Sequence, residues 1–205
     1  KRETTIKGLF AAGDVAGGCP QKYVTGALAE GEIAAKSAVE FNAQNSSSSI
    51  DKSDTDIHIK EVEKFLTNKN SRFNYEQLEE AMQTVMDTYA GGIKTNYRFN
   101  EKQLDIADYK IKQLMSLVST LYAEDFQELM YIYELKERLT VCRSVIAHLK
   151  ARKETRWHSF AENLDYPNKD EKNFNKYVNS RLENGEIKII IRDLVQGGKE
   201  YEHIN

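Results

Sequence analysis

The middle of the chain carries apolar residues at three- and four-residue intervals, the spacing of helices that bury one face. This pattern predicts long helices over about 74–89, 100–121 and 124–153, preceded by a short helix over about 58–67. Short connections between long amphipathic helices favour antiparallel neighbours. The inward positions include Leu78, Met82, Val85, Leu104, Ala107, Ile111, Leu129, Ile132, Leu139 and Ile146. We therefore expect an antiparallel three-helix bundle.

The start of the chain has a different pattern. A strand-like run over 5–11 leads into Gly13-Asp14, and a second glycine pair follows at 17–18. A helical run of small residues over 27–41 comes next. The residues available for its buried face are Leu28, Ile33, Ala34 and Val39. This order predicts a strand, a loop and a helix left over from an α/β layer.

The end of the chain changes pattern again. Tyr166-Pro167 breaks any helix. Asn-Gly at 184–185 lies between two strand-like runs, 176–181 and 186–194, which is a strong signal for a β-hairpin. The fold class predicted for the whole chain is therefore α+β, mainly α, with a C-terminal hairpin.

Composition excludes several classes of function. The net charge of -3 arises from charges of both signs spread over 205 residues, so nucleic acid is a poor partner. No apolar run approaches the roughly 20 residues of a membrane helix, so we expect no direct membrane insertion and a cytoplasmic chain. Cys19 and Cys142 are the two cysteines, without metal-ligand spacing, so we assign no metal site and place any electron-carrying cluster in a partner.

Two stretches resemble one flavoprotein superfamily. GLFAAGDVAGGCPQKYVTGALAEGEIAAKSAV, residues 8–39, resembles the last flavin-binding motif of the fumarate reductase, succinate dehydrogenase and adenylylsulfate reductase superfamily. HLKARKETRWHSFAENLDYP, residues 148–167, resembles the Arg-x-Glu-[Ser/Thr]-Arg to Asp-[Tyr/Phe]-Pro stretch that follows its helical domain. Trp157 favours the adenylylsulfate reductase branch. With MDTYAGGI at 86–93, the resemblance covers nearly the whole chain.

The resemblance implies a C-terminal portion of an FAD-dependent oxidoreductase subunit that passes electrons between a flavin and an iron–sulfur partner. The expected parts are the end of the FAD-binding domain (1–41), a polar linker (42–56), the helical domain (57–153) and a tail with the hairpin (154–205). The alternative is an independent helical interaction module without a cofactor.

The residues of the first motif suit a flavin. A flavin presents ribityl hydroxyl groups and a ring edge that becomes negative on reduction. Following Gly13, Asp14 can accept from the hydroxyls, and the amides near Thr25, Gly26 and Ala27 at the start of a helix can face the negative edge. We predict these five residues as the cofactor-binding set.

The loop between the Gly13-Asp14 turn and the following helix differs from the sequence patterns of the fumarate reductase and adenylylsulfate reductase families. Fumarate reductases carry an arginine in a Gly-Ala-Asn-Arg-Leu-Gly stretch, and this loop has none, which argues against ordinary dicarboxylate chemistry. Where adenylylsulfate reductases usually have His-Lys-Phe, this chain has Gln21, Lys22 and Tyr23. Gln21 cannot carry a proton at neutral pH, and Lys22 could hold an anion or simply be solvated. We place Gln21 and Lys22 as substrate-facing candidates.

Several other side chains are weighed and not assigned to catalysis. They are His148, His158, Trp157 with Phe160, and Glu154 with Arg156. The histidines show no acid–base partner, and the aromatic pair fits a packing anchor, within the chain or against a partner, better than a redox relay. The ion pair either reaches the active site of the intact subunit or is structural, and the structural reading is favoured.

The Gly-x-Gly-x-x-Gly turn that holds a dinucleotide pyrophosphate does not occur in the sequence. The chain also begins with Lys1 directly before its strand-like run, as a piece of a longer protein would. We therefore expect that the chain alone neither binds FAD tightly nor turns over a substrate.

Overall fold

The computed structural model describes residues 1–16, 23–45 and 52–194. These residues form two compact units, and the boundary falls between Thr55 and Asp56. Each unit has its own packing. Among the described helices, none combines the length and the apolar composition that a bilayer crossing needs.

The first unit begins with a loop that folds back on itself. Glu3 and Phe10 form an isolated antiparallel β-bridge, and the Thr4 amide donates to the Leu9 carbonyl at 2.8 Å. Within residues 1–16, the opening strand expected over 5–11 is reduced to this bridge. A strand becomes regular where a neighbouring strand satisfies its backbone groups along its length, and a single bridge satisfies few of them.

A single long helix, α1 (Val24–Gln44), packs against this loop through a stripe of small and polar side chains and through Phe41, whose ring meets that of Phe10 edge to face at a centroid distance of 6.1 Å. Its buried residues are Glu30, Ala34 and Ser37. Three of the four residues expected on the buried face are instead exposed: Leu28 by 70%, Ile33 by 45% and Val39 by 71%. The stripe at 30, 34 and 37 follows helical spacing, and Ala34 and Ser37 are small enough for the loop to approach closely, so Leu28, Ile33 and Val39 lie on other faces.

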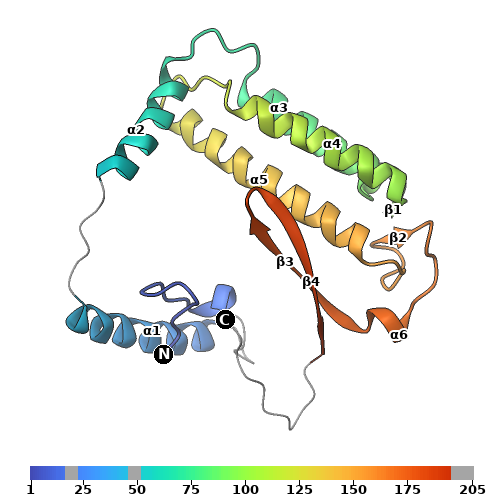
Figure 1. The fold of residues 1–205 in the computed structure, drawn as a ribbon, viewed down its shortest axis with the longest axis horizontal. Helices are drawn as coiled ribbons and strands as arrows, with labels where there is room; N and C mark the ends of the chain where they lie inside the picture. Colours follow the sequence, from blue (N-terminus) through green and yellow to red (C-terminus); the bar gives the residue numbers. More distant parts are fainter. Residues whose placement is uncertain (17–22, 46–51, 195–205) are drawn as a thin grey trace. The chain divides into compact units, whose positions relative to one another are not determined.

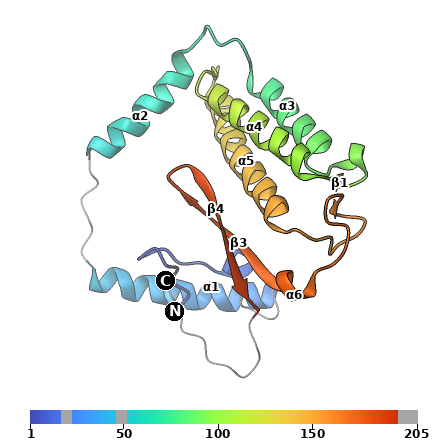
Figure 2. The same ribbon diagram turned by 45° about the vertical axis from the view of Figure 1, so that its right-hand side comes forward.

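The second unit contains the predicted bundle. Its helices are α2 (Lys52–Thr67, which begins just before the boundary), α3 (Tyr75–Tyr89), α4 (Glu101–Val118) and α5 (Phe126–Ala151). Figures 1 and 2 show α3, α4 and α5 side by side. The largest fully buried apolar side chains are Leu104, Ile111, Leu121, Ile132, Leu135, Leu139 and Ile146. The three-helix bundle is confirmed, and apolar burial on this scale is its main source of stability.

Polar residues define where the bundle helices begin. Asn74 accepts from the Gln77 amide at 2.9 Å, and Asn100 accepts from the Gln103 amide at 2.8 Å. In return, each glutamine side chain accepts from the backbone N–H of its asparagine, which completes two capping boxes. Asp125 caps α5 in a simpler way, without the reciprocal bond of a box. These caps satisfy amides that the helices themselves cannot pair.

The connection between α3 and α4 depends on two glycines. Gly91 has φ +77°, and a Cβ on Gly92 would lie 2.3 Å from the Cα of Asp87. The left-handed backbone at Gly91 and the lack of space at Gly92 both require glycine. The chain then passes through a 3-10 turn, η2 (Ile93–Thr95), into the short strand β1 (Arg98–Phe99).

The tail adds short elements and the predicted hairpin. The elements are β2 (Glu162–Asn163), parallel to β1, then α6 (Glu171–Phe174), β3 (Lys176–Glu183) and β4 (Glu186–Asp193). Strands β3 and β4 pair antiparallel from Lys176 opposite Asp193 to Glu183 opposite Glu186. Between them, Asn184 and Gly185 have φ 51° and 79°, as a two-residue turn of type I′ requires. The hairpin is confirmed, and it packs on α5.

Candidate functional site

The predicted glycine turn is formed as a 3-10 turn, η1 (Gly13–Ala16), beside the first turns of α1. Gly13 is buried and has φ +75°, and its absent Cβ would lie 3.5 Å from the Cβ of Ala27. The positive φ makes glycine the residue of choice there. Asp14 follows on the exposed side of the turn. The turn and the helix start that the sequence predicts as one site are therefore neighbours in space.

No side chain of the described residues caps the start of α1. Tyr23 precedes the helix with an extended backbone and makes no side-chain capping hydrogen bond. Its carbonyl accepts from the Ala27 amide at 3.0 Å, so that amide, one of the three predicted to face a ligand, is used within the helix. The amides of Thr25 and Gly26 precede it and have no acceptor inside a helix. They carry the positive end of the helix dipole.

A buried carboxylate that sequence reasoning missed connects the turn to the helix. The Gly13 amide donates to Oε2 of Glu30 at 2.8 Å, and Glu30 is 2% exposed. Nη2 of Arg2 lies 3.3 Å from the other oxygen, Oε1, which has no hydrogen-bond partner. One signal pointed to Glu30: it lies one turn after Ala27, in the stripe that continues with Ala34. A charged residue in such a stripe calls for a partner.

The substrate-facing candidates Gln21 and Lys22 lie outside the described residues. Tyr23, the last residue of that loop, is described and is exposed at the start of α1. The geometry available for a ligand therefore concerns the turn and the helix start.

The second motif, around Glu154, is architectural. The Glu154 side chain is fully buried and accepts from Arg156 through Nε at 2.8 Å and Nη2 at 3.1 Å. Arg152 Nη1 and the Asp170 amide donate to the same carboxylate at 2.7 and 2.8 Å. Burial raises the pKa of Glu154, but these hydrogen bonds outweigh it and hold the pKa below the ordinary value. The structural reading of the Glu154–Arg156 pair fits this network.

The residues after Glu154 tie the tail to the bundle. The Thr155 hydroxyl donates to the Tyr166 carbonyl at 2.9 Å and accepts from the Asn163 amide at 3.0 Å. Asp165 accepts from the Glu101 amide at 2.7 Å, which places a carboxylate at the start of α4. The motif that carried the resemblance thus fixes the loop between α5 and α6.

The aromatic pair of this loop is exposed: Trp157 by 67% and Phe160 by 75%. Ser159, between them, has φ +79°. The Phe160 ring lies 6.5 Å from that of Tyr97, centroid to centroid, so it makes one contact within the second unit, and most of the surface of the pair is open to a partner. The two histidines weighed for catalysis lie apart from this pair in role. Nδ1 of His158 lies 3.5 Å from Oε1 of Glu162 on the surface. The pKa of His148 is lowered, mainly by burial and to a smaller extent by the positive charge of Arg152.

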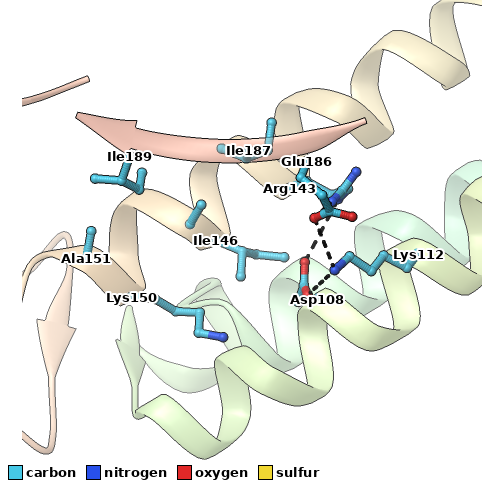
Figure 3. A pocket seen from close by; sticks show the side chains of 10 residues that line it. Asp108, Lys112, Arg143, Ile146, Lys150, Ala151, Glu186, Ile187 and Ile189 are labelled. Carbon is cyan, nitrogen blue, oxygen red and sulfur yellow. Dashed lines mark hydrogen bonds and ion pairs between the residues drawn. The ribbon is translucent and has the colours of Figure 1, made fainter. Parts of the chain in front are cut away.

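A cavity of about 320 Å³ lies between α4, α5 and β4 (Figure 3). Arg143, 7% exposed, donates to the Gly185 carbonyl at 2.7 Å and to Glu186 at 2.8 Å. Lys112 lies 3.1 Å from Asp108 and 3.6 Å from Glu186. These charges pair with one another at the mouth of the cavity, where Lys112 and Glu186 are exposed and Arg143 is buried, so we assign the cavity to the attachment of the hairpin to the bundle.

The described elements define a class of protein: a glycine turn and an uncapped helix, followed by a helical bundle with a hairpin tail, as in the C-terminal region of flavoprotein reductases. A family profile described as "Fumarate reductase flavoprotein C-term" matches residues 79–199. The chain belongs to this family, and the resemblance predicted from the two motifs is confirmed.

Individual relatives agree with the family. The alpha subunit of adenylylsulfate reductase from Megalodesulfovibrio gigas is 26% identical over 89% of this chain and 29% of its own length. An uncharacterised FAD-dependent oxidoreductase from Methanocaldococcus jannaschii is 32% identical over 80% of this chain and 30% of its own length. The structure of adenylylsulfate reductase from Archaeoglobus fulgidus superposes with a TM-score of 0.82 and 33% identity, over 98% of this chain and 34% of that chain. The chain thus spans about a third of these relatives.

Proposed function

We propose that this chain is the C-terminal part of an FAD-dependent oxidoreductase subunit, in which the Gly13–Asp14 turn and the start of α1 form one wall of the flavin pocket. The observation that carries the proposal is the turn that presents Asp14 to solvent beside a helix start that Tyr23 leaves without a side-chain cap. A protein that used these amides for its own stability would be expected to cap them, as α3 and α4 are capped.

The residues present fit a flavin. Asp14 accepts from a ribityl hydroxyl, and Gly13, with φ +75°, gives the turn the backbone that presents Asp14 on its exposed side. The amides of Thr25 and Gly26 donate toward the ring edge that becomes negative on reduction, and the small side chain of Ala27 permits close approach. When bound, FAD supplies the hydride and electron transfer, which the side chains of this wall do not provide.

The proposal includes an iron–sulfur partner. The Megalodesulfovibrio gigas relative is called a subunit, as is a fumarate reductase flavoprotein from Haemophilus influenzae, and a flavin that collects two electrons needs an acceptor or donor for them. The exposed Trp157 and Phe160 supply aromatic surface of the kind that protein interfaces use. The helical unit and its tail would then serve as part of the docking surface.

FAD titration, followed by the quenching of flavin fluorescence, tests the proposal in two proteins. The chain alone is expected to show no sub-micromolar dissociation constant, because it spans about a third of its relatives and lacks the pyrophosphate turn. The product of the complete reading frame is expected to bind FAD tightly. In that protein, Asp14→Ala should weaken binding by about tenfold or more, since a hydrogen bond to a charged group is lost.

Glu32→Gln is the matched control. Glu32 is exposed on α1 and pairs with Lys36 on the same helix, outside the proposed wall. The proposal fails if Asp14→Ala binds FAD as tightly as Glu32→Gln does, or if the complete protein binds no flavin at all.

A helical interaction module without a cofactor is the second candidate, because the exposed Trp157 and Phe160 fit an interface whether or not a flavin is bound. The genomic sequence discriminates between the two. A start codon immediately before Lys1 supports the module, whereas an upstream Gly-x-Gly-x-x-Gly in the same frame supports the flavoprotein.

A further inference from the structure

We propose that Glu30 is a positioning residue for the flavin: its carboxylate holds the Gly13–Asp14 turn against α1 and so sets where Asp14 lies relative to the helix start. The inference rests on the proposed function and adds a residue that contacts the turn and not the flavin.

The contact is a hydrogen bond between a side chain and the backbone of the turn. The Gly13 amide donates to Oε2 of Glu30 at 2.8 Å across 17 residues of sequence, and both groups are buried. Gly13 has a left-handed backbone that other residues rarely adopt. The hydrogen bond fixes the direction of the Gly13 N–H and with it the plane of the peptide group that joins residues 12 and 13. Asp14 is the next residue, so its position depends on that plane. Loss of the bond would let the turn rotate about Gly13.

Glu30 and the residues of the proposed wall lie on one helix. Ala27, whose Cβ faces the Gly13 position at 3.5 Å, is three residues before Glu30 and therefore on the same face. The turn is thus attached to α1 at two successive levels, by packing at Ala27 and by the hydrogen bond at Glu30. The distance from the turn to the amides of Thr25 and Gly26 depends on both.

The burial of this carboxylate is costly, and the hydrogen bond from Gly13 is its one hydrogen bond among the described residues. Arg2 approaches Oε1 to 3.3 Å, but Oε1 accepts no hydrogen bond, and the Arg2 side chain is 37% exposed. The other buried positions of α1, Ala34 and Ser37, are uncharged. A long side chain with a terminal oxygen at this position reaches the Gly13 amide, which the short side chains of Ala34 and Ser37 on the same stripe do not do.

Three substitutions separate the position of the acceptor from its charge. Glu30→Gln keeps an oxygen at the same reach without the charge, Glu30→Asp keeps the charge but withdraws it by one methylene group, and Glu30→Ala removes both. A positioning role predicts that Glu30→Gln keeps slow Gly13 exchange and tight FAD binding better than Glu30→Asp does. Glu30→Asp should in turn be no worse than Glu30→Ala. A role of the charge itself predicts the reverse order of Gln and Asp.

The first measurement uses this chain as it is and needs no flavin. Hydrogen exchange of the Gly13 amide, followed by NMR, should be slow in the parent and in Glu30→Gln. It should accelerate by about tenfold or more in Glu30→Ala, since the opening of a charge-assisted bond no longer limits exchange. Glu32→Gln, an exposed substitution on the same helix, should leave exchange unchanged. Unchanged Gly13 exchange in Glu30→Ala would overturn the inference.

The second measurement uses the product of the complete reading frame. Glu30→Ala should weaken FAD binding by about tenfold and shift the visible absorption bands of the bound flavin, whereas Glu30→Gln should stay within about threefold of the parent. If Glu30→Ala does not fold, the FAD affinities of Glu30→Gln and Glu30→Asp decide between a role of the acceptor's position and a role of its charge. Should Asp14→Ala weaken FAD binding while every Glu30 variant binds as the parent does, this inference alone fails. Should Asp14→Ala also have no effect, the proposed function fails.

Discussion

The two units of the chain bury their residues in opposite ways. In the second unit, α3, α4 and α5 enclose large aliphatic side chains such as Leu104, Ile132 and Leu139. In the first unit, α1 buries a glutamate, an alanine and a serine and exposes Leu28 and Val39. A unit with a complete apolar core is stable through its own packing. A helix that leaves its larger apolar residues uncovered is instead suited to further contacts, which in the proposed function come from the rest of a flavin domain.

The largest expected effect concerns the buried charge of the second unit. Glu154→Ala should lower the free energy of unfolding of that unit by about 3–5 kcal/mol, because Arg152 and Arg156 would lose their shared buried acceptor. Urea unfolding followed by circular dichroism measures the change. Glu171→Gln is the control, since Glu171 is an exposed partner of Arg156 and should change stability by less than about 1 kcal/mol. Equal effects of the two substitutions would show that the buried Glu154 network does not stabilise the second unit more than an exposed ion pair does.

A second pair of substitutions tests the comparison between the units directly. Leu139→Ala should cost about 2–5 kcal/mol, because Leu139 is fully buried and its truncation leaves a cavity. Leu28→Ala on α1 should change the stability of this chain by less than about 0.5 kcal/mol, because Leu28 is already in contact with solvent. Differential scanning calorimetry of both variants measures the contrast. A Leu28→Ala cost comparable to that of Leu139→Ala would mean that α1 is covered in solution.

The sequence predicts the second unit well because its patterns are local. Three- and four-residue spacing gave the bundle helices to within a few residues, and Asn184-Gly185 gave the hairpin turn. Each pattern is satisfied by contacts inside the same unit. The Gly13–Asp14 turn and the start of α1 were also predicted, from their glycines and from the resemblance.

The sequence predicts the first unit less well because its packing is not set by local patterns. The buried face of α1 was assigned from apolarity, whereas the structure selects small side chains beside Glu30. The role of Glu30 depends on a contact with Gly13, 17 residues away, which no periodicity encodes. The opening strand failed to extend for a related reason, since a strand depends on neighbours that a sequence window does not contain.

Acid should destabilise the second unit through Glu154. Its pKa is lowered in the folded state, so its contribution is complete above the ordinary carboxyl value of 4.5 and is lost as the pH falls toward the lowered pKa. The effect should be smaller than that of Glu154→Ala, because a protonated carboxyl can still fill its site. Urea unfolding between about pH 6 and about pH 3 should show a steeper loss for the parent than for Glu154→Gln, which has no proton to gain. Parallel pH profiles would place the acid sensitivity elsewhere.

The smallest expected effect links stability and function at the helix starts. Asn100 caps α4, whereas Tyr23, at the same position of α1, leaves the Thr25 and Gly26 amides uncapped. Because Tyr23 already has an extended backbone, Tyr23→Asn should add a capping bond and stabilise α1 by about 0.5–1 kcal/mol, measured by hydrogen exchange along the helix. If those amides face a flavin, the same substitution should weaken FAD binding in the complete protein, because the asparagine side chain then competes for them. A cap that stabilises α1 without any loss of flavin affinity would mean that the helix start is uncapped for a reason other than the cofactor.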